Sequence, residues 1–292
     1  MERFSRQHEG REVNLPSQDV LDAFRVAGVP VVLPGGEGRS VQVGDVVFKP
    51  ADPDPESTAW LAETMAAVGE DGFRVARPLR TVSGAWSFGG WTASRHVAGV
   101  EPDHRAELRW LDIVAAGRAF HRSLERLSRP GFLDRRSNWW ATGDRVAWQE
   151  QEPDLLPVFQ GPYEVLSALF GPPPPDRPQL VHGDLTGNVL FAPGLAPAII
   201  DLSPYWRPPS FGEAVVLGDA LIWHGAEADL LDQAATHGMR DAVRYVARAI
   251  VHRLVTTSER ARERHVEHDP DTLADIERYQ RTAELVTDYA RG

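Results

Sequence analysis

The feature that most constrains this chain is a pair of short apolar runs that surround a polar loop. Residues 180–191 read LVHGDLTGNVLF, and a second run, AIIDL, follows at residues 198–202. Apolar runs of this length, bounded by Gly, Asp and Asn, favour strands over helices. We therefore expect a short hairpin here, with a strand pair that holds the polar loop rigid.

The polar side chains of this segment suit one kind of chemistry. Phosphoryl transfer needs a carboxylate that orients and deprotonates an alcohol, and oxygen ligands that hold magnesium against the phosphates. Asp184 and Asn188 lie on the loop, and Asp201 ends the second run. These three residues form a candidate catalytic and magnesium site. The alternative is an ordinary turn, because Asp, Asn and Gly are also common turn formers.

The first hundred residues predict a small, mostly antiparallel sheet with one helix between its third and fourth strands. Gly44-Asp45 is a strong hairpin signal between two strand-like runs. Ser17 is a candidate N-cap and Gly28 a candidate stop for a first helix. The expected helices cover 17–28 and the stretch that ends at residue 68, and the expected strands cover 29–33, two pieces within 39–50, 73–80 and 91–97.

The pattern becomes helical after Gly99. Apolar residues recur at helical spacing in later segments, whereas residues 128–178 are rich in Trp, Pro and Gly and remain unassigned. The fold class is therefore α+β in two lobes: a β-rich lobe over residues 1–97 and a helical lobe over 98–292. The expected helices of the second lobe cover 108–127, 212–224, 239–264 and 272–290.

The loop motif resembles that of the aminoglycoside phosphotransferase-like small-molecule kinases, relatives of choline and fructosamine kinases with a bilobal protein-kinase-like fold. The matching residues are His182-Gly183-Asp184, Asn188 and Ile200-Asp201. The resemblance implies that Asp184 is the catalytic base, that Asn188 and Asp201 bind magnesium, and that His182 braces the loop. It also implies that Asp219 is a buried carboxylate that pins the loop, although an ordinary exposed helix acid is the alternative.

The loop departs from the family pattern in one respect. Three residues separate Asp184 from Asn188 here, where the family has four. The short form, H-G-D-L-x-G-N, resembles an actinobacterial subgroup of the family. Either Gly187 allows a tighter loop that still brings Asn188 to the metal, or one metal ligand is misplaced.

The basic residues are very unevenly divided, since 30 of the 31 are Arg and one is Lys, at position 49. Lys49 ends the third predicted strand, where the kinase-like fold places the lysine that contacts the nucleotide phosphates. A compact ammonium and a forked guanidinium are not interchangeable there. Glu63, in the following helix, is the favoured partner of Lys49, and Glu56 is the competitor.

A glycine-rich turn precedes Lys49. It matches neither the G-x-G-x-x-G fingerprint nor a Walker A motif, because Pro50 follows the lysine. By the resemblance, it is a phosphate lid, and the hinge that contacts adenine through backbone groups lies near residues 94–97. The residues implied in nucleotide binding are Gly35, Gly36, Gly38, Ser40, Arg95 and Val97.

Composition excludes several other classes of protein. The absence of Cys excludes disulfides, thiolate metal sites and Cys nucleophiles. The net charge of −11 argues against nucleic acid as a partner. No run approaches the ~18 apolar residues of a membrane span, and the charged N-terminus has no signal core. We expect a cytoplasmic protein, and composition does not predict its oligomeric state.

Together these features predict an ATP- and Mg²⁺-dependent phosphotransferase that acts on a hydroxyl group of a small molecule. Residues 98–292 contain 29 acidic and 21 basic residues. That excess suits a cationic acceptor such as an amino sugar or an aminoglycoside-like compound. The alternative is a catalytically degenerate nucleotide-binding module with regulatory function. A ligand-free acidic scaffold would require the motifs to be accidental.

Overall fold

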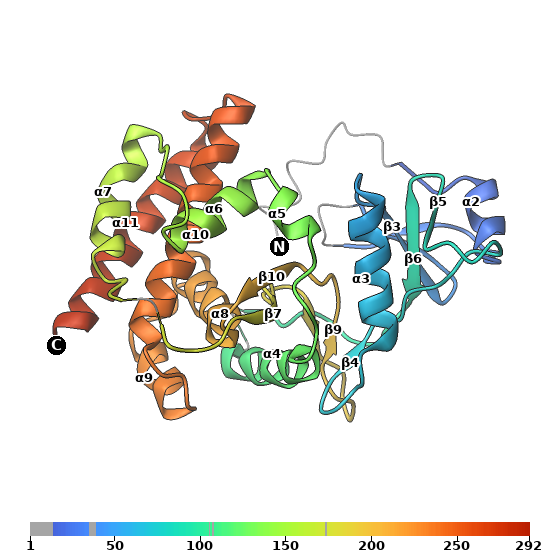
Figure 1. Ribbon diagram of the computed structural model, residues 1–292, viewed down its shortest axis with the longest axis horizontal. Helices are drawn as coiled ribbons and strands as arrows, with labels where there is room; N and C mark the ends of the chain where they lie inside the picture. The colour runs from blue at the N-terminus through green and yellow to red at the C-terminus, as the bar shows by residue number, and fades with distance from the viewer. Residues whose placement is uncertain (1–13, 35–38, 105, 107, 173) are drawn as a thin grey trace. The chain divides into compact units, whose positions relative to one another are not determined.

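The computed structural model describes residues 14–34, 39–104, 106, 108–172 and 174–292 (Figure 1). The chain forms two compact units. The first comprises Met1–Val100 together with Phe191–Ile200, and the second comprises Glu101–Leu190 together with Asp201–Gly292. The small, β-rich first unit and the larger, helical second unit confirm the predicted α+β class.

An antiparallel sheet of five strands forms the body of the first unit. Its spatial order is β1-β2-β3-β6-β5. The predicted hairpin is confirmed between β2 and β3, where Gly44 adopts φ +60°. Only glycine reaches that region without steric cost. The strands are β1 (Val31–Val32), β2 (Val41–Val43), β3 (Val46–Pro50), β5 (Ser87–Phe88) and β6 (Trp91–Arg95).

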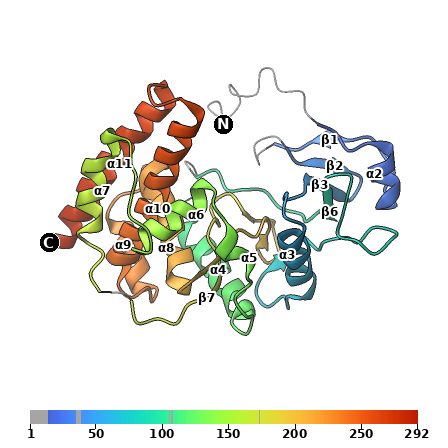
Figure 2. The ribbon, with the colours of Figure 1, turned by 45° about the horizontal axis from the view of Figure 1, so that its top comes forward.

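One face of this sheet is the core of the first unit. Side chains alternate between the two faces of a strand. On β3 this alternation buries Val46 and Phe48 and turns Lys49 to the opposite face. The helix α2 (Gln18–Ala23) covers the apolar face, and Phe24 meets Phe48 edge-on with ring centroids 5.6 Å apart (Figure 2). Helix α2 is shorter than predicted, because the chain turns away at Arg25 with φ +55°.

The helix α3 (Pro55–Ala67) follows β3, as predicted. The Asp54 side chain accepts a hydrogen bond from the Glu56 amide at 3.0 Å, and Pro55 occupies the first helical turn. Both features are favourable helix starts. Glu56, which the sequence pattern placed in the Pro-rich entry, is therefore part of the helix.

The strand predicted over residues 73–80 is much shorter than expected. Only β4 (Arg74–Val75) forms, and it pairs in parallel with β9 (Ala198–Ile199) rather than with the antiparallel sheet. Proline lacks the N–H that a ladder needs, and Pro78 makes only an isolated bridge to Ser94.

The second unit is built around one long helix. Residues 245–258 of α10 are all buried, so this helix is the centre of the bundle, where it contacts α6, α7, α8 and α11 (Figure 1). No helix in the described ranges combines the length and apolar character of a membrane span. The helices are α4 (Trp110–Leu124), α5 (Phe132–Arg135), α6 (Trp139–Ala147), a 3₁₀ turn (Pro157–Phe159), α7 (Gln160–Ser167), α8 (Pro209–Trp223), α9 (Asp229–Thr236), α10 (Ala242–Arg264) and α11 (Pro270–Arg291).

The strand pair that holds the polar loop differs from the one predicted from the two apolar runs. The strand β7 (Gln179–His182) pairs in antiparallel register with β10 (Pro204–Arg207), a segment that the sequence pattern did not mark as a strand. The second apolar run instead forms β9, whose residues are fully buried beside β4. Buried parallel strands read as continuous apolar runs, so the pattern alone did not reveal the partner. The strand β8 (Val189–Leu190) follows the loop and is the second neighbour of β9 in the sheet order β4-β9-β8.

Candidate active site

Asp184 lies in the loop directly after β7, and the loop is tied to β10. The Gly183 amide donates to the Ser203 carbonyl at 2.9 Å. A Cβ atom at position 183 would lie 2.3 Å from the Tyr205 ring, far inside normal contact distance. Glycine is therefore required at this position, and the β7–β10 pair supplies the rigidity that was expected of a hairpin.

Two buried histidines support the backbone of the loop. The His182 amide donates to His121 Nε2 at 3.0 Å, and the Asp184 amide donates to His182 Nδ1 at 3.1 Å. His121 comes from α4. Burial, together with the nearby His182, lowers the pKa of His121 to about 3, so its ring is a neutral acceptor at physiological pH. His182 lies where the resemblance placed a bracing residue.

The shortened loop keeps Asn188 against Asp184. The Asn188 Nδ2 group donates to the Asp184 carbonyl at 2.7 Å and lies 3.4 Å from Asp184 Oδ2. Gly187 adopts φ +79°, a left-handed conformation that glycine tolerates. The loop is therefore tight and places Asn188 beside Asp184, and the role of Asn188 as a metal ligand stays a prediction. Because the Nδ2 group of Asn188 donates to Asp184, its Oδ1 atom is the one left to act as a metal ligand.

Asp201 begins the chain segment that follows β9, and its conformation is unusual. Its φ is +52°, one of five positive values at non-glycine residues in the described chain, and its side chain is exposed. Left-handed conformations at non-glycine residues cluster at functional sites.

The donor chemistry of Asn188 and Asp201 fits magnesium. Mg²⁺ prefers oxygen ligands and is usually held by one or two protein groups together with water and substrate phosphates. An amide oxygen from Asn188 and a carboxylate from Asp201 would supply that set. No group of three or more His, Asp or Glu side chains in the described part of the chain could hold a metal by itself.

A buried arginine connects Asp184 to the core of the second unit. Arg253, on α10, donates from Nε and one terminal nitrogen to both oxygens of Asp219, each at 2.8 Å. The same terminal nitrogen donates to Asp184 Oδ1 at 2.6 Å. The side chains of Arg253 and Asp219 are 6% and 4% exposed, whereas that of Asp184 is 39% exposed. The Asp219 carboxylate therefore reaches the loop through Arg253.

The charges in this cluster stabilise one another. Burial by itself lowers the pKa of Arg253, but Asp219 and Asp184 together raise it well above its usual range. Burial raises the pKa of Asp219, and Arg253 opposes that rise. A buried charge is tolerated when it is paired and hydrogen-bonded, as here.

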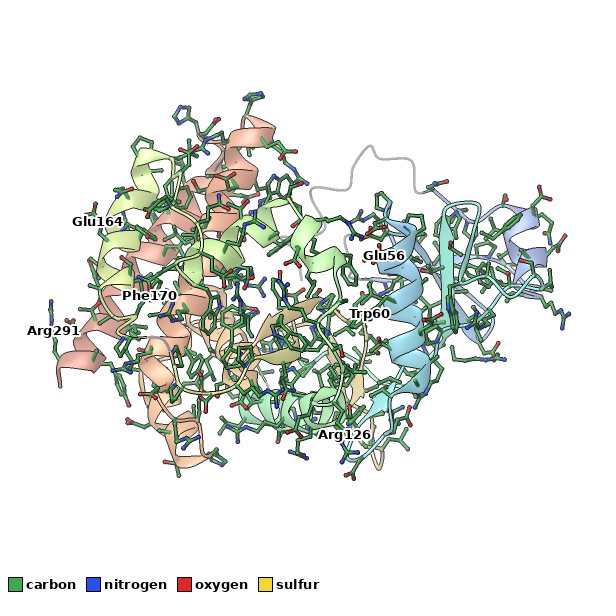
Figure 3. All side chains as sticks on the ribbon, in the orientation of Figure 1. Glu56, Trp60, Arg126, Glu164, Phe170 and Arg291 are labelled. Atoms are coloured by element: carbon green, nitrogen blue, oxygen red, sulfur yellow. The ribbon has the colours of Figure 1, made fainter. Side chains whose placement is uncertain are left out.

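The first unit carries the predicted phosphate-binding lysine. Lys49 lies on β3, opposite Thr92 of β6, on the face of the sheet that α2 does not cover. Glu56 and Glu63 are both exposed, and their helical spacing places both on the side of α3 that carries Trp60. Figure 3 labels Glu56 and Trp60 on that helix. The choice of Glu63 as the partner of Lys49 stays a prediction.

The other predicted nucleotide contacts fall around the same sheet. Gly35, Gly36 and Gly38 lie outside the described residues, and Ser40 is buried beside β2. The Arg95 amide donates to the Arg77 carbonyl at 2.8 Å, and its guanidinium pairs with Asp45. An amide contact to adenine would therefore come from a neighbouring residue, and Val97 is partly exposed two residues further on.

Sequence reasoning missed two residues of this site. The chain contains thirty arginines, and Arg253 is one of several in a helical stretch. His121 lies in an ordinary amphipathic helix. Neither position carries a local signal, because the role of each comes from partners 34 to 69 residues away in the chain.

Solved structures of known proteins share this fold. The structure is similar to an aminoglycoside phosphotransferase from Alicyclobacillus acidocaldarius, with 15% identity, a TM-score of 0.66 and coverage of 97% of each chain. A choline/ethanolamine kinase family protein from Mesorhizobium loti has 17% identity and a TM-score of 0.59, with coverage of 99% of this chain and 97% of that one.

The third solved structure is a thermostable mutant of aminoglycoside phosphotransferase APH(4)-Ia in ternary complex with ADP and hygromycin B. It has 14% identity and a TM-score of 0.58, with coverage of 94% of this chain and 98% of that one. At these identities the three structures show the fold. A search of curated proteins finds no match. The model of the phosphotransferase enzyme family matches residues 30–205, more than half of the chain, so the protein belongs to the phosphotransferase enzyme family.

Proposed function

We propose that the protein transfers the γ-phosphoryl group of ATP to a hydroxyl group of a small molecule, with magnesium. The observation that carries this proposal is the setting of Asp184. Its backbone is fixed by His182, one carboxylate oxygen is held by Arg253, and Asn188 is folded against it. A rigidly placed carboxylate beside a candidate magnesium ligand is what phosphoryl transfer to an alcohol requires.

In the proposed reaction, the acceptor oxygen forms a bond to the γ-phosphorus while the bond from that phosphorus to the bridging oxygen of ADP breaks. The bridging oxygen keeps the electron pair and leaves with ADP. Asp184 Oδ2 accepts the hydroxyl proton, because Oδ1 is already engaged by Arg253 at 2.6 Å. Positioning and electrostatic stabilisation supply most of the catalysis in reactions of this kind.

The remaining residues bind and orient the nucleotide. Lys49 would contact the phosphates through its ammonium group. Asn188 and Asp201 would hold magnesium, which offsets phosphate charge when it is bound.

The acceptor is proposed to be cationic, such as an amino sugar. The support is the charge of the second unit, which contains 29 acidic and 21 basic residues. An acidic surface raises the local concentration of cations and speeds their association.

A panel assay tests this function. The protein is incubated with ATP and Mg²⁺ and with amino sugars, neutral alcohols or anionic alcohols, and the phosphorylated products are detected by mass spectrometry. We expect turnover that requires Mg²⁺ and is fastest with cationic acceptors. Turnover of anionic acceptors alone would refute the acceptor class. Binding of ATP without phosphate transfer to any acceptor would favour the degenerate nucleotide-binding module.

A further inference from the structure

We infer that Arg253 is a positioning residue for the catalytic base, an inference that rests on the proposed function. Its guanidinium does more than fill the core, because one nitrogen serves two carboxylates at once. That nitrogen lies 2.6 Å from Asp184 Oδ1 and 2.8 Å from Asp219 Oδ2, and Nε holds Asp219 Oδ1 at 2.8 Å. The side chain of Asp184 is therefore oriented by a residue of α10 rather than by its own loop alone.

The surroundings of Arg253 fix the guanidinium in place. It projects from the fully buried middle of α10, and Asp219 lies in the fully buried middle of α8. The Trp140 and Trp223 rings lie with their centroids 5.4 Å and 6.0 Å from the guanidinium carbon. Cation–π contacts at these distances are attractive. The donor that meets Asp184 therefore has little freedom to move.

Arg253 neutralises its two carboxylate partners to different extents. One cation faces two anions, so the cluster has a net charge of −1. Asp219 is the buried carboxylate and takes two hydrogen bonds from Arg253, whereas the half-exposed Asp184 takes one. Asp184 is thus the less fully paired of the two carboxylates.

The single hydrogen bond from Arg253 also distinguishes the two oxygens of Asp184. Oδ1 accepts a hydrogen bond from Arg253 at 2.6 Å. The contact of Oδ2 with Asn188 Nδ2 is much longer, at 3.4 Å. Because Arg253 engages Oδ1, Oδ2 is the oxygen that is left to accept the proton. A lysine could not substitute, because a single ammonium lacks the fork that reaches Asp219 twice while it holds Asp184.

Two variants separate positioning from simple structural support. Arg253→Gln removes the cation but leaves Asp219 buried without its partner, which destabilises the fold. The double variant Arg253→Gln/Asp219→Asn removes the buried charge pair together, and neutral replacement of a buried pair is usually tolerated. The matched control is Arg118→Gln/Glu213→Gln. Glu213 is also on α8 and is bidentate to Arg118 at 2.7–2.8 Å, but neither residue contacts Asp184.

The measurements are the melting temperature, the affinity for ATP with Mg²⁺, and kcat and KM with the best acceptor of the panel. For the double variant we expect a melting temperature that recovers most of the loss seen in Arg253→Gln, unchanged nucleotide affinity, and kcat about 100-fold below the parent, since small misplacements of a reacting group cost that much. Arg253→Lys should also lose kcat while it keeps KM. The control should keep kcat.

Each outcome decides one question. If kcat of the double variant recovers together with its melting temperature, Arg253 is structural and the inference is wrong, while the proposed function stands. If the parent protein transfers phosphate to no acceptor and does not hydrolyse ATP, the proposed function fails, and the positioning role fails with it.

Discussion

Mild acid should destabilise this protein through His121, one of the two histidines that support the loop of Asp184. Its side chain is buried, and its pKa is about 3 in the native state against 6.5 in the unfolded chain. Between these values the unfolded chain binds a proton that the native ring does not bind. The free energy of unfolding therefore falls as the pH falls below about 6.5.

The size of this effect follows from the two pKa values. At pH 5 the native ring is still neutral, so the loss depends only on protonation of the unfolded chain. A pKa that is 1.5 units above the solution pH corresponds to about 2 kcal/mol. At pH 7 the same contribution is close to zero, so acidification from pH 7 to pH 5 removes about 2 kcal/mol through His121.

Urea unfolding of the parent and of His121→Gln at pH 7, 6 and 5 measures this contribution. Glutamine can still accept a hydrogen bond from the His182 amide, but it does not titrate. The buried His252 also has a pKa well below its usual value, mainly because of burial, and it is present in both proteins, so its contribution cancels. The stability advantage of the parent over the variant should shrink by about 2 kcal/mol between pH 7 and pH 5. Parallel pH dependence in the two proteins would refute a buried, neutral His121.

Three substitutions test the other parts of the site. Lys49→Arg should lower turnover at least about tenfold with the fold intact, because a guanidinium does not replace an ammonium between phosphates; turnover equal to the parent in a steady-state assay would make the single lysine an accident. Gly183→Ala should cost about 1–3 kcal/mol in urea unfolding, because its Cβ would overlap the Tyr205 ring at 2.3 Å. Parent-like stability would show that Tyr205 can move aside. Asp201→Asn should raise the Mg²⁺ concentration needed for half-maximal turnover at least about tenfold, since it removes a charged ligand; an unchanged Mg²⁺ titration would remove Asp201 from the metal site.

Local signals in the sequence predicted the parts of the fold that depend on neighbouring residues. Gly44 marks a hairpin because its positive φ is needed within a tight turn, and the alternation on β3 follows from the order of its residues alone. The loop motif is compact, so Asp184 and Asn188 were recognised together. The contact between them then depended on Gly187, which the sequence also shows.

Pairings between distant segments could not be predicted in the same way. The partner of β7 is β10, and the parallel partner of β9 is β4, more than a hundred residues earlier. An apolar run shows that a strand is buried, but it does not show beside which strand. The role of Arg253 was hidden for the same reason, because its meaning comes from Asp184 and Asp219, which are 69 and 34 residues away in the chain.

The most direct test of the central claim compares the parent with Asp184→Asn in two assays on the same samples. The first measures binding of ATP with Mg²⁺ by calorimetry, and the second measures transfer of labelled γ-phosphate to the best acceptor of the panel. We expect equal nucleotide affinity and a loss of transfer of at least about 100-fold, because asparagine keeps the shape of the side chain but accepts no proton. Transfer by Asp184→Asn at the rate of the parent would contradict the assignment of Asp184 as the catalytic base.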